Sequence, residues 1–180
     1  MTKTTLALSC ALITLPILCQ AQAQQPDVKT ISGHAQSLEA MAQTNILKSA
    51  EKMPEANYSF KPTPDIRSYA ELIGHVADAS YMFCSSSLGE KCPATSSAEK
   101  TLKTKAALVE ALTASFVYCD KAFAALNDEN AGQSVKFFGS ERARVGVLSF
   151  QTAHLFEHYG NIITYLRLKN IVPPSSEPKK

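Results

Sequence analysis

The motifs of several common enzyme and cofactor classes are absent from this 180-residue chain. It has no glycine-rich phosphate-binding loop, no serine-elbow motif, no C-x-x-C-H motif for covalent haem and no internal repeat. Its 18 Lys and Arg residues nearly balance its 16 Asp and Glu residues, and no basic helix carries interleaved aromatic residues. These absences argue against phosphate-loop nucleotide binding, serine-hydrolase chemistry, c-type haem and a nucleic-acid partner.

The only long apolar run lies near the N-terminus. Lys3 precedes the run Leu6–Leu18, and the small-residue box Ala21-Gln22-Ala23 follows it. This is the order of a secretory signal peptide, and the run is too short to span a membrane. We predict that residues 1–23 are a signal peptide, removed before Gln24.

The mature chain is then expected to be exported. Cys19 raises the alternative of a lipid anchor, but Leu18 precedes it where a small residue is expected. Since Lys3 is the only charged residue removed, 17 basic and 16 acidic residues remain in a chain of 157 residues. We expect a soluble periplasmic or secreted protein in an oxidising compartment, with no membrane contact after cleavage.

Four stretches of the mature chain have the three- and four-residue apolar spacing of helices. They run from about Ser37 to Met53, from Thr63 to about Cys84, from the stretch Ser96–Glu99 to about Leu126 and from about Ser140 to Lys169. No segment is a convincing strand. The sequence therefore predicts an all-α four-helix bundle within residues 24–174, followed by a disordered tail, 175–180.

The predicted helix boundaries rest on capping signals. Thr63 suits an N-cap, Pro64 the first helical position, and Asp65 the positive end of the helix dipole. The stretch Ser96-Ser97-Ala98-Glu99 reads as a capping box that opens the third helix. Ser140 is the expected cap of the fourth helix.

Histidines are the most informative polar residues. His154 and His158 lie four apart on the apolar face of the fourth helix, so both rings can reach one metal ion. His75 lies at the border of the apolar stripe of the second helix and is the candidate third ligand. Asp78, one turn later, is either an outer hydrogen-bond partner or an ordinary surface carboxylate. His34 lies before or at the start of the first helix, where a solvated histidine is expected.

Two other metal-site motifs do not fit the sequence. His154, Glu157 and His158 match the H-x-x-E-H pattern of inverted zinc peptidases, but those enzymes need a further carboxylate ligand well downstream, and only 22 residues follow His158. Glu157 also projects away from the direction that the two histidines share. Di-iron bundles need E-x-x-H pairs, and neither Glu71 with His75 nor Glu157 with His158 has that spacing.

These motifs resemble one family. The segment Tyr69-Ala-Glu-Leu-Ile-Gly-His75, the later H-x-x-x-H, and the endings Tyr159-Gly-Asn-Ile-Ile-Thr-Tyr-Leu-Arg167 and Ile171-Val-Pro-Pro are similar to the DinB-like (DinB/YfiT) superfamily. The resemblance covers nearly all of the mature chain. It implies an up-down-down-up bundle with a long crossover between helices two and three. It also implies a divalent metal, most often zinc or nickel, held here by His75, His154 and His158.

The resemblance also suggests an activity. Some relatives are thiol transferases or isomerases that use bacillithiol, mycothiol or glutathione, so the expected partner is a small molecule such as a thiol, and a homodimer is compatible with the family. Three imidazoles leave metal positions open for water or substrate, as in catalytic zinc sites. We therefore expect a metal-dependent thiol transferase or hydrolase with no catalytic residue assigned. The alternative is a non-enzymatic bundle in which the metal only ties helices together.

Three cysteines remain in the mature chain, so it can hold at most one internal disulfide. In the helix order that the family implies, helices two and three are parallel, and the ends that carry Cys84 and Cys119 meet. The resemblance therefore favours a Cys84–Cys119 bridge. A local Cys84–Cys92 bridge and three free thiols remain the alternatives.

Overall fold

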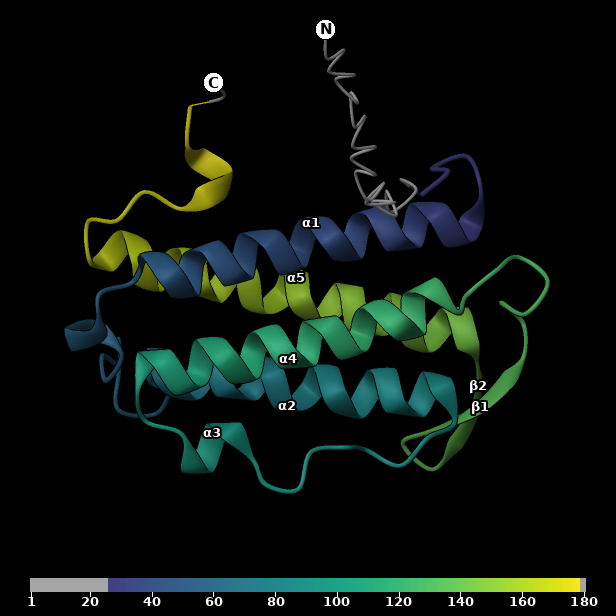
Figure 1. Ribbon diagram of the computed structural model, residues 1–180. Coiled ribbons are helices and arrows are strands. Elements are labelled where there is room, and N and C mark those ends of the chain that lie inside the picture. The colour runs from purple at the N-terminus through teal and green to yellow at the C-terminus, as the bar shows by residue number, and fades with distance from the viewer. Residues whose placement is uncertain (1–25, 179–180) are drawn as a thin grey trace, which may run out of the picture.

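The computed structural model describes residues 26–178 (Figure 1). The predicted signal peptide lies outside the described residues. Four long helices form the body: α1 (Ile31–Lys52), α2 (Tyr69–Leu88), α4 (Lys105–Ala124) and α5 (Arg144–Leu168). The smaller elements are η1 (Glu55–Asn57), α3 (Ala98–Thr101), β1 (Ser134–Phe137), β2 (Ser140–Ala143) and η2 (Pro174–Ser176).

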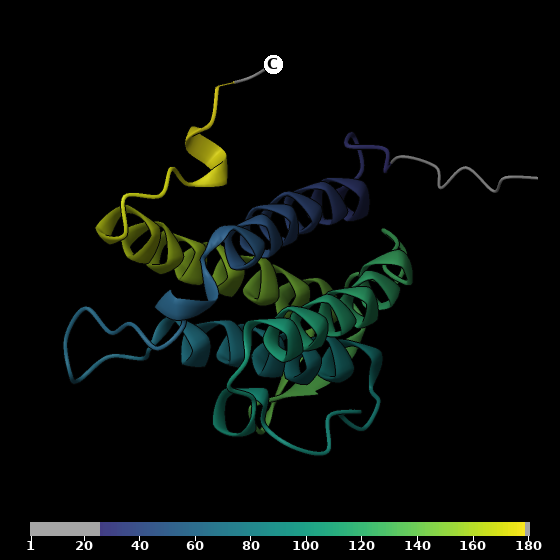
Figure 2. The same cartoon turned by 60° about the vertical axis from the view of Figure 1, so that its left-hand side comes forward.

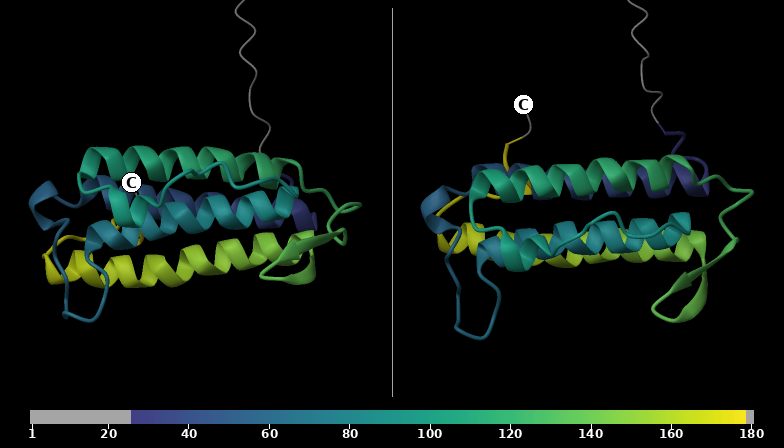
Figure 3. Two further views of the ribbon diagram at one scale, coloured as in Figure 1. Left: turned by 90° about the horizontal axis from the view of Figure 1, so that it is seen from below. Right: turned by 60° about the horizontal axis from the view of Figure 1, so that its bottom comes forward.

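The four long helices form the predicted bundle. Helix α2 packs on α4 and α5, and α1 packs on the same two helices. In Figure 1, α1 and α5 run in one direction and α2 and α4 in the other, which confirms the up-down-down-up order. The crossover, residues 89–104, returns along the bundle and carries α3 on the outer side of α2 and α4 (Figure 2). The β1–β2 hairpin and the α1–α2 connection lie at opposite ends (Figure 3).

Apolar side chains fill the space between these helices. The main cluster joins all four helices and includes the fully buried residues Ile46, Ile73, Leu108, Leu112, Leu155, Ile162 and Leu166. Near the C-terminal ends of α2 and α4, Cys84 and Cys119 are joined by a disulfide, with 5.2 Å between their Cα atoms. Cys92, in the crossover, is half-buried and forms no disulfide with the described residues.

The first two helices begin elsewhere than predicted. Helix α1 starts at Ile31 rather than near Ser37, because the Thr30 side chain accepts a hydrogen bond from the Gly33 amide. The predicted start of α2 at Thr63 is wrong. Helix α2 starts at Tyr69, since Ser68 and Glu71 form a reciprocal capping box, in which the Ser68 amide donates to Glu71 at 2.7 Å.

The predicted third helix is two helices. Ser97 accepts a hydrogen bond from the Lys100 amide and opens α3, which lasts only one turn. A separate N-cap, Thr104, then opens α4 and accepts a hydrogen bond from the Ala107 amide. A helix does begin in the predicted stretch Ser96–Glu99, but the Glu99 carboxylate contacts Arg67 and His75 and does not close a capping box. The helix that begins there is also not the core helix.

A hairpin replaces the predicted start of the fourth helix. Residues Ser134–Phe137 pair antiparallel with Ser140–Ala143, so the prediction of no strands and of Ser140 as a helix cap is wrong. The two-residue turn places Phe138 at φ 48° and Gly139 at φ 76°. Positive φ at both positions matches the twist of a tight hairpin, and glycine adopts it without a steric penalty.

The C-terminal segment is placed as far as Pro178, within the stretch predicted to be a disordered tail. The Tyr159 hydroxyl donates to Ser175 Oγ at 2.8 Å and accepts from the Ser175 amide at 3.0 Å. Lys52 of α1 pairs with Glu177. Among residues 26–178, no helix combines the length and apolar character needed to cross a membrane.

Candidate metal centre

The three predicted metal ligands meet between α2 and α5. One nitrogen of each ring, from His75, His154 and His158, lies within 4.8 Å of the others. The Nε2 atoms of His154 and His158 are 2.9 Å apart, as the four-residue spacing on one helix face allows. The His75 ring lies 5.3 Å from the His154 ring and 4.8 Å from the His158 ring, between centroids. His34 is exposed in the first turn of α1 and takes no part.

Glu99 of α3 is the outer partner of this group. Its Oε2 lies 3.2 Å from His75 Nδ1, and its Oε1 accepts a hydrogen bond from Arg67 Nε at 2.8 Å. When His75 Nδ1 carries the ring proton and donates to Glu99, Nε2 is left as the free nitrogen. A carboxylate on the other side of the ring fixes the orientation of a metal-binding histidine and increases its basicity.

Asp78 is neither an outer hydrogen-bond partner of a histidine nor an ordinary surface carboxylate, the two roles predicted from the sequence. Its carboxylate does not contact a histidine but accepts hydrogen bonds from the start of α3: Oδ1 from the Ala98 amide at 2.7 Å, and Oδ2 from Ser97 Oγ at 2.6 Å and the Glu99 amide at 3.2 Å. Asp78 therefore holds the short helix that presents Glu99 to His75. Glu99 was not predicted as a site residue, because its sequence context indicates only a capping box.

The close approach of α3 depends on Gly74, the residue before His75. A methyl group at this position would lie 2.6 Å from Glu99 Cα and from Glu99 N, closer than carbon atoms can pack. Glycine therefore allows the backbone of the crossover to lie directly on α2. The G-H pair by itself does not indicate this contact, because the same pair occurs at Gly33-His34, where His34 is exposed.

Burial keeps two of the histidines neutral. It lowers the pKa of His154 to about 3, and the neighbouring His158, His75 and Arg67 lower it further. Burial also lowers the pKa of His158 to about 4, with His75 and Arg67 acting in the same direction. The Phe83 ring, whose centroid is 5.2 Å from that of His154, supplies part of the apolar surroundings. Neutral imidazoles are the form that binds metal ions.

The chemistry of the group fits a divalent metal. Three imidazole nitrogen donors converge, and the described residues contribute no fourth His, Cys, Asp or Glu to the group. The Nδ1 atoms of His154 and His158 are buried and have no hydrogen-bond partner among the described residues, so only His75 has a carboxylate behind it. Glu157 is exposed and Glu71 serves the α2 cap, so neither joins the group.

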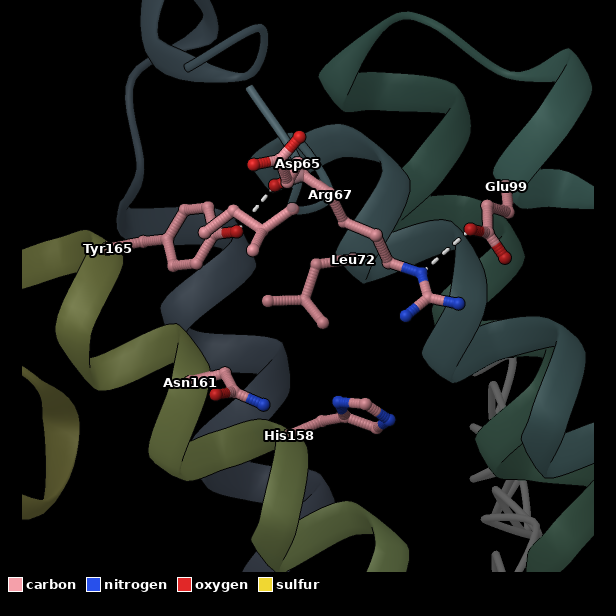
Figure 4. A pocket seen from close by; sticks show the side chains of 8 residues that line it. Asp65, Arg67, Leu72, Glu99, His158, Asn161 and Tyr165 are labelled. Atoms are coloured by element: carbon pink, nitrogen blue, oxygen red, sulfur yellow. Dashed lines mark hydrogen bonds and ion pairs between the residues drawn. The ribbon is translucent and has the colours of Figure 1, made fainter. Parts of the chain in front are cut away.

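A cavity of about 440 Å³ opens beside His158 (Figure 4). Its apolar walls come from Ile66, Leu72 and Tyr165. Its polar lining is Asp65, Arg67, Glu99, Asn161 and His158. The site thus combines a metal-ligand group with a space large enough for a small molecule.

Solved structures of similar fold have low sequence identity to this chain. A DinB-like protein from Bacillus cereus matches with a TM-score of 0.70 and 16% identity, over 81% of this chain and 96% of that one. A DinB-like protein from Bacillus subtilis matches with a TM-score of 0.65 and 19% identity, over 81% and 99%. A mycothiol-dependent maleylpyruvate isomerase matches with a TM-score of 0.60 and 15% identity, over 73% of this chain and 60% of that one.

The family is established from the sequence match. No curated protein matches the chain. The DinB superfamily pattern, in contrast, matches residues 40–162, which extend from α1 to α5 and include all three histidines. This protein therefore belongs to the DinB superfamily.

Proposed function

We propose that this protein binds one divalent metal ion, zinc or nickel, through His75, His154 and His158 and acts on a small molecule in the adjacent cavity. The observation that carries the proposal is the convergence of three donors within 4.8 Å beside a cavity that His158 itself lines. A structural zinc site is usually closed by four protein ligands, whereas a three-donor group leaves positions for water or substrate.

The chain's own residues prepare the site in three ways. Burial keeps His154 and His158 neutral, Glu99 orients His75, and Leu72 with Tyr165 provides an apolar wall. A bound divalent metal would supply Lewis acidity toward a water molecule or a thiol. We propose thiol transfer or hydrolysis as the reaction, and the fold shared with a mycothiol-dependent isomerase supports a thiol cosubstrate.

A non-enzymatic metal bundle is the second candidate, because the three histidines also link α2 to α5. The adjoining cavity favours the enzyme. The two candidates differ in one observable property: an enzyme site exchanges its non-protein ligands, whereas a purely structural site does not.

Metal titration tests the proposal. A ligand that binds only the folded state at a hundredfold excess over its Kd adds about 2.7 kcal/mol to the free energy of unfolding. For a domain of this size, zinc or nickel added to chelator-treated protein should raise Tm by about 5 °C. Alanine at His75, His154 or His158 should abolish this response, and the exposed His34→Ala control should keep it. A response that persists in His158→Ala would contradict the site.

We also propose that the protein is exported after cleavage of residues 1–23. Lys3, the run Leu6–Leu18 and the Ala21-Gln22-Ala23 box support this proposal, and a disulfide suits an oxidising compartment. Mass spectrometry of the native protein should find an N-terminus near Gln24. An intact Met1 or a lipid-modified Cys19 would contradict export by this route.

A further inference from the structure

Arg67 is a charged residue of the cavity to which the metal site assigns no role. It precedes the Ser68 cap of α2, and its carbonyl accepts a hydrogen bond from the Tyr165 hydroxyl at 2.5 Å. Its Nε donates to Glu99 Oε1 at 2.8 Å, and its side chain is 43% exposed. Hydrogen bonds therefore hold both the Arg67 carbonyl and the Nε atom of its guanidinium in place at the cavity wall.

The two terminal nitrogens of Arg67 are free to bind a ligand. No residue among 26–178 accepts a hydrogen bond from Nη1 or Nη2. Figure 4 shows the guanidinium between Glu99 and His158, with Asp65 at the far end of the cavity. A guanidinium whose Nε is already bound can still bind a carboxylate end-on, by donating a hydrogen bond from each of its two terminal nitrogens.

Glu99 connects this cation to the metal ligands. One of its oxygens contacts Arg67 and the other contacts His75, so a single side chain sets the position of both. A positive group beside a metal site is electrostatically unfavourable, and here the charges of Arg67 and a bound divalent ion exceed those of Glu99 and Asp65. An anionic ligand would offset that excess.

We propose that the molecule bound in this cavity is a small organic carboxylate, held by the two terminal nitrogens of Arg67 with its other end directed toward His158. Leu72, Ile66 and Tyr165 contact a short apolar middle section, and the exposed Asn161 offers an amide at the rim. This inference rests on the proposed metal-dependent function and names its substrate class.

Two matched hydroxamates test the carboxylate contact. The monohydroxamate of succinic acid and butyrohydroxamate share a metal-binding group and a chain length, but only the first has a terminal carboxylate. Their binding to cobalt-loaded full-length protein is followed by the visible absorption of the cobalt ion. Wild type should bind the succinic probe at least about tenfold more tightly, the effect of one charge-assisted contact.

Substitution of Arg67 tests whether this residue causes the preference for the succinic probe. Arg67→Gln should bring the ratio of the two affinities close to one, because only the succinic probe has a carboxylate contact to lose. Arg142→Gln removes the same charge from β2, at the opposite end of the bundle, and should keep the ratio. If Arg67→Gln does not fold, Arg67→Lys serves instead: it keeps the charge, lacks the paired nitrogens and should lose most of the preference.

The outcomes separate this inference from the proposed function. Equal affinity of the two probes for cobalt-loaded wild type, or an unchanged ratio in Arg67→Gln, would overturn the carboxylate proposal and leave the metal site standing. Failure of cobalt to bind wild type, or binding that His158→Ala does not affect, would overturn the metal site itself. A full preference in Arg67→Lys would contradict end-on binding by a guanidinium.

Discussion

Gly74 of α2 lies directly under the backbone of Glu99, so close that a methyl group on Gly74 would be 2.6 Å from both Glu99 Cα and Glu99 N. This contact lets α3 pack on α2 beside His75. At that distance the Glu99 carboxylate reaches His75 Nδ1, at 3.2 Å. The orientation of one candidate metal ligand thus depends on the absence of a side chain at the preceding residue, Gly74.

Gly74→Ala should therefore weaken both folding and metal binding. An added methyl in a packed contact typically costs about 1–3 kcal/mol, and loss of an outer carboxylate partner lowers metal affinity about 10- to 100-fold. Thermal unfolding and zinc titration of purified protein measure the two effects.

Two further variants control this prediction. Gly160→Ala, at an open position of α5, should stabilise the protein by about 0.5–1 kcal/mol and leave zinc affinity unchanged. Glu99→Gln keeps the packing on Gly74 but weakens the bond to His75, so it should lose zinc affinity without the packing cost. Normal zinc binding in both Gly74→Ala and Glu99→Gln would show that His75 needs no outer partner.

The metal-free protein should lose stability in mild acid. The pKa values of His154 and His158 are lowered in the fold to about 3 and about 4, from an ordinary value of 6.5. Below pH 6.5 the unfolded chain therefore binds more protons at these sites than the folded chain, and protonation favours unfolding. Their stabilising contribution is complete above pH 6.5 and falls progressively toward pH 4 and below.

The contribution of the histidines must be separated from that of the buried Glu39, whose effect on stability changes with pH in the opposite direction. Comparison with a histidine variant separates the two. Burial raises the pKa of Glu39, so its contribution is complete at low pH and is lost as pH rises through the folded-state value. Tm of chelator-treated wild type should fall more steeply between pH 7 and pH 4 than that of His154→Gln. The exposed His34→Gln should follow wild type. Identical pH profiles for wild type and His154→Gln would contradict the assignment.

The cysteine pairing has a direct chemical test. Non-reducing peptide mapping should find Cys84 joined to Cys119 and only Cys92 open to alkylation. With a sequence separation of 35 between the bridged positions, the chain-entropy contribution is about 4 kcal/mol, so replacing both bridged cysteines by alanine should lower stability by up to this amount. Cys92→Ser is the control and should leave Tm unchanged. Three alkylatable thiols would contradict the bridge.

The sequence by itself determined the helices that carry the histidines, because apolar periodicity and residue spacing are local properties. The four-residue separation of His154 and His158 puts both on one helix face whatever the helix packs against. The same locality explains the errors at helix ends. Several Ser and Thr residues near each boundary could serve as caps, and only packing selects Ser68 over Thr63, or Thr104 over Ser97, for a long helix.

Only the tertiary structure decided what surrounds the three histidines. Glu99 reaches His75 across 24 residues and Arg67 across 32, because the crossover folds back onto Gly74 and is held there by Asp78. No periodicity in the sequence encodes such a contact, since its partners lie on different elements and their distance is set by how a loop docks. The cavity beside His158 has the same origin: its lining comes from the α1–α2 connection, α2, the crossover and α5, which only folding brings together.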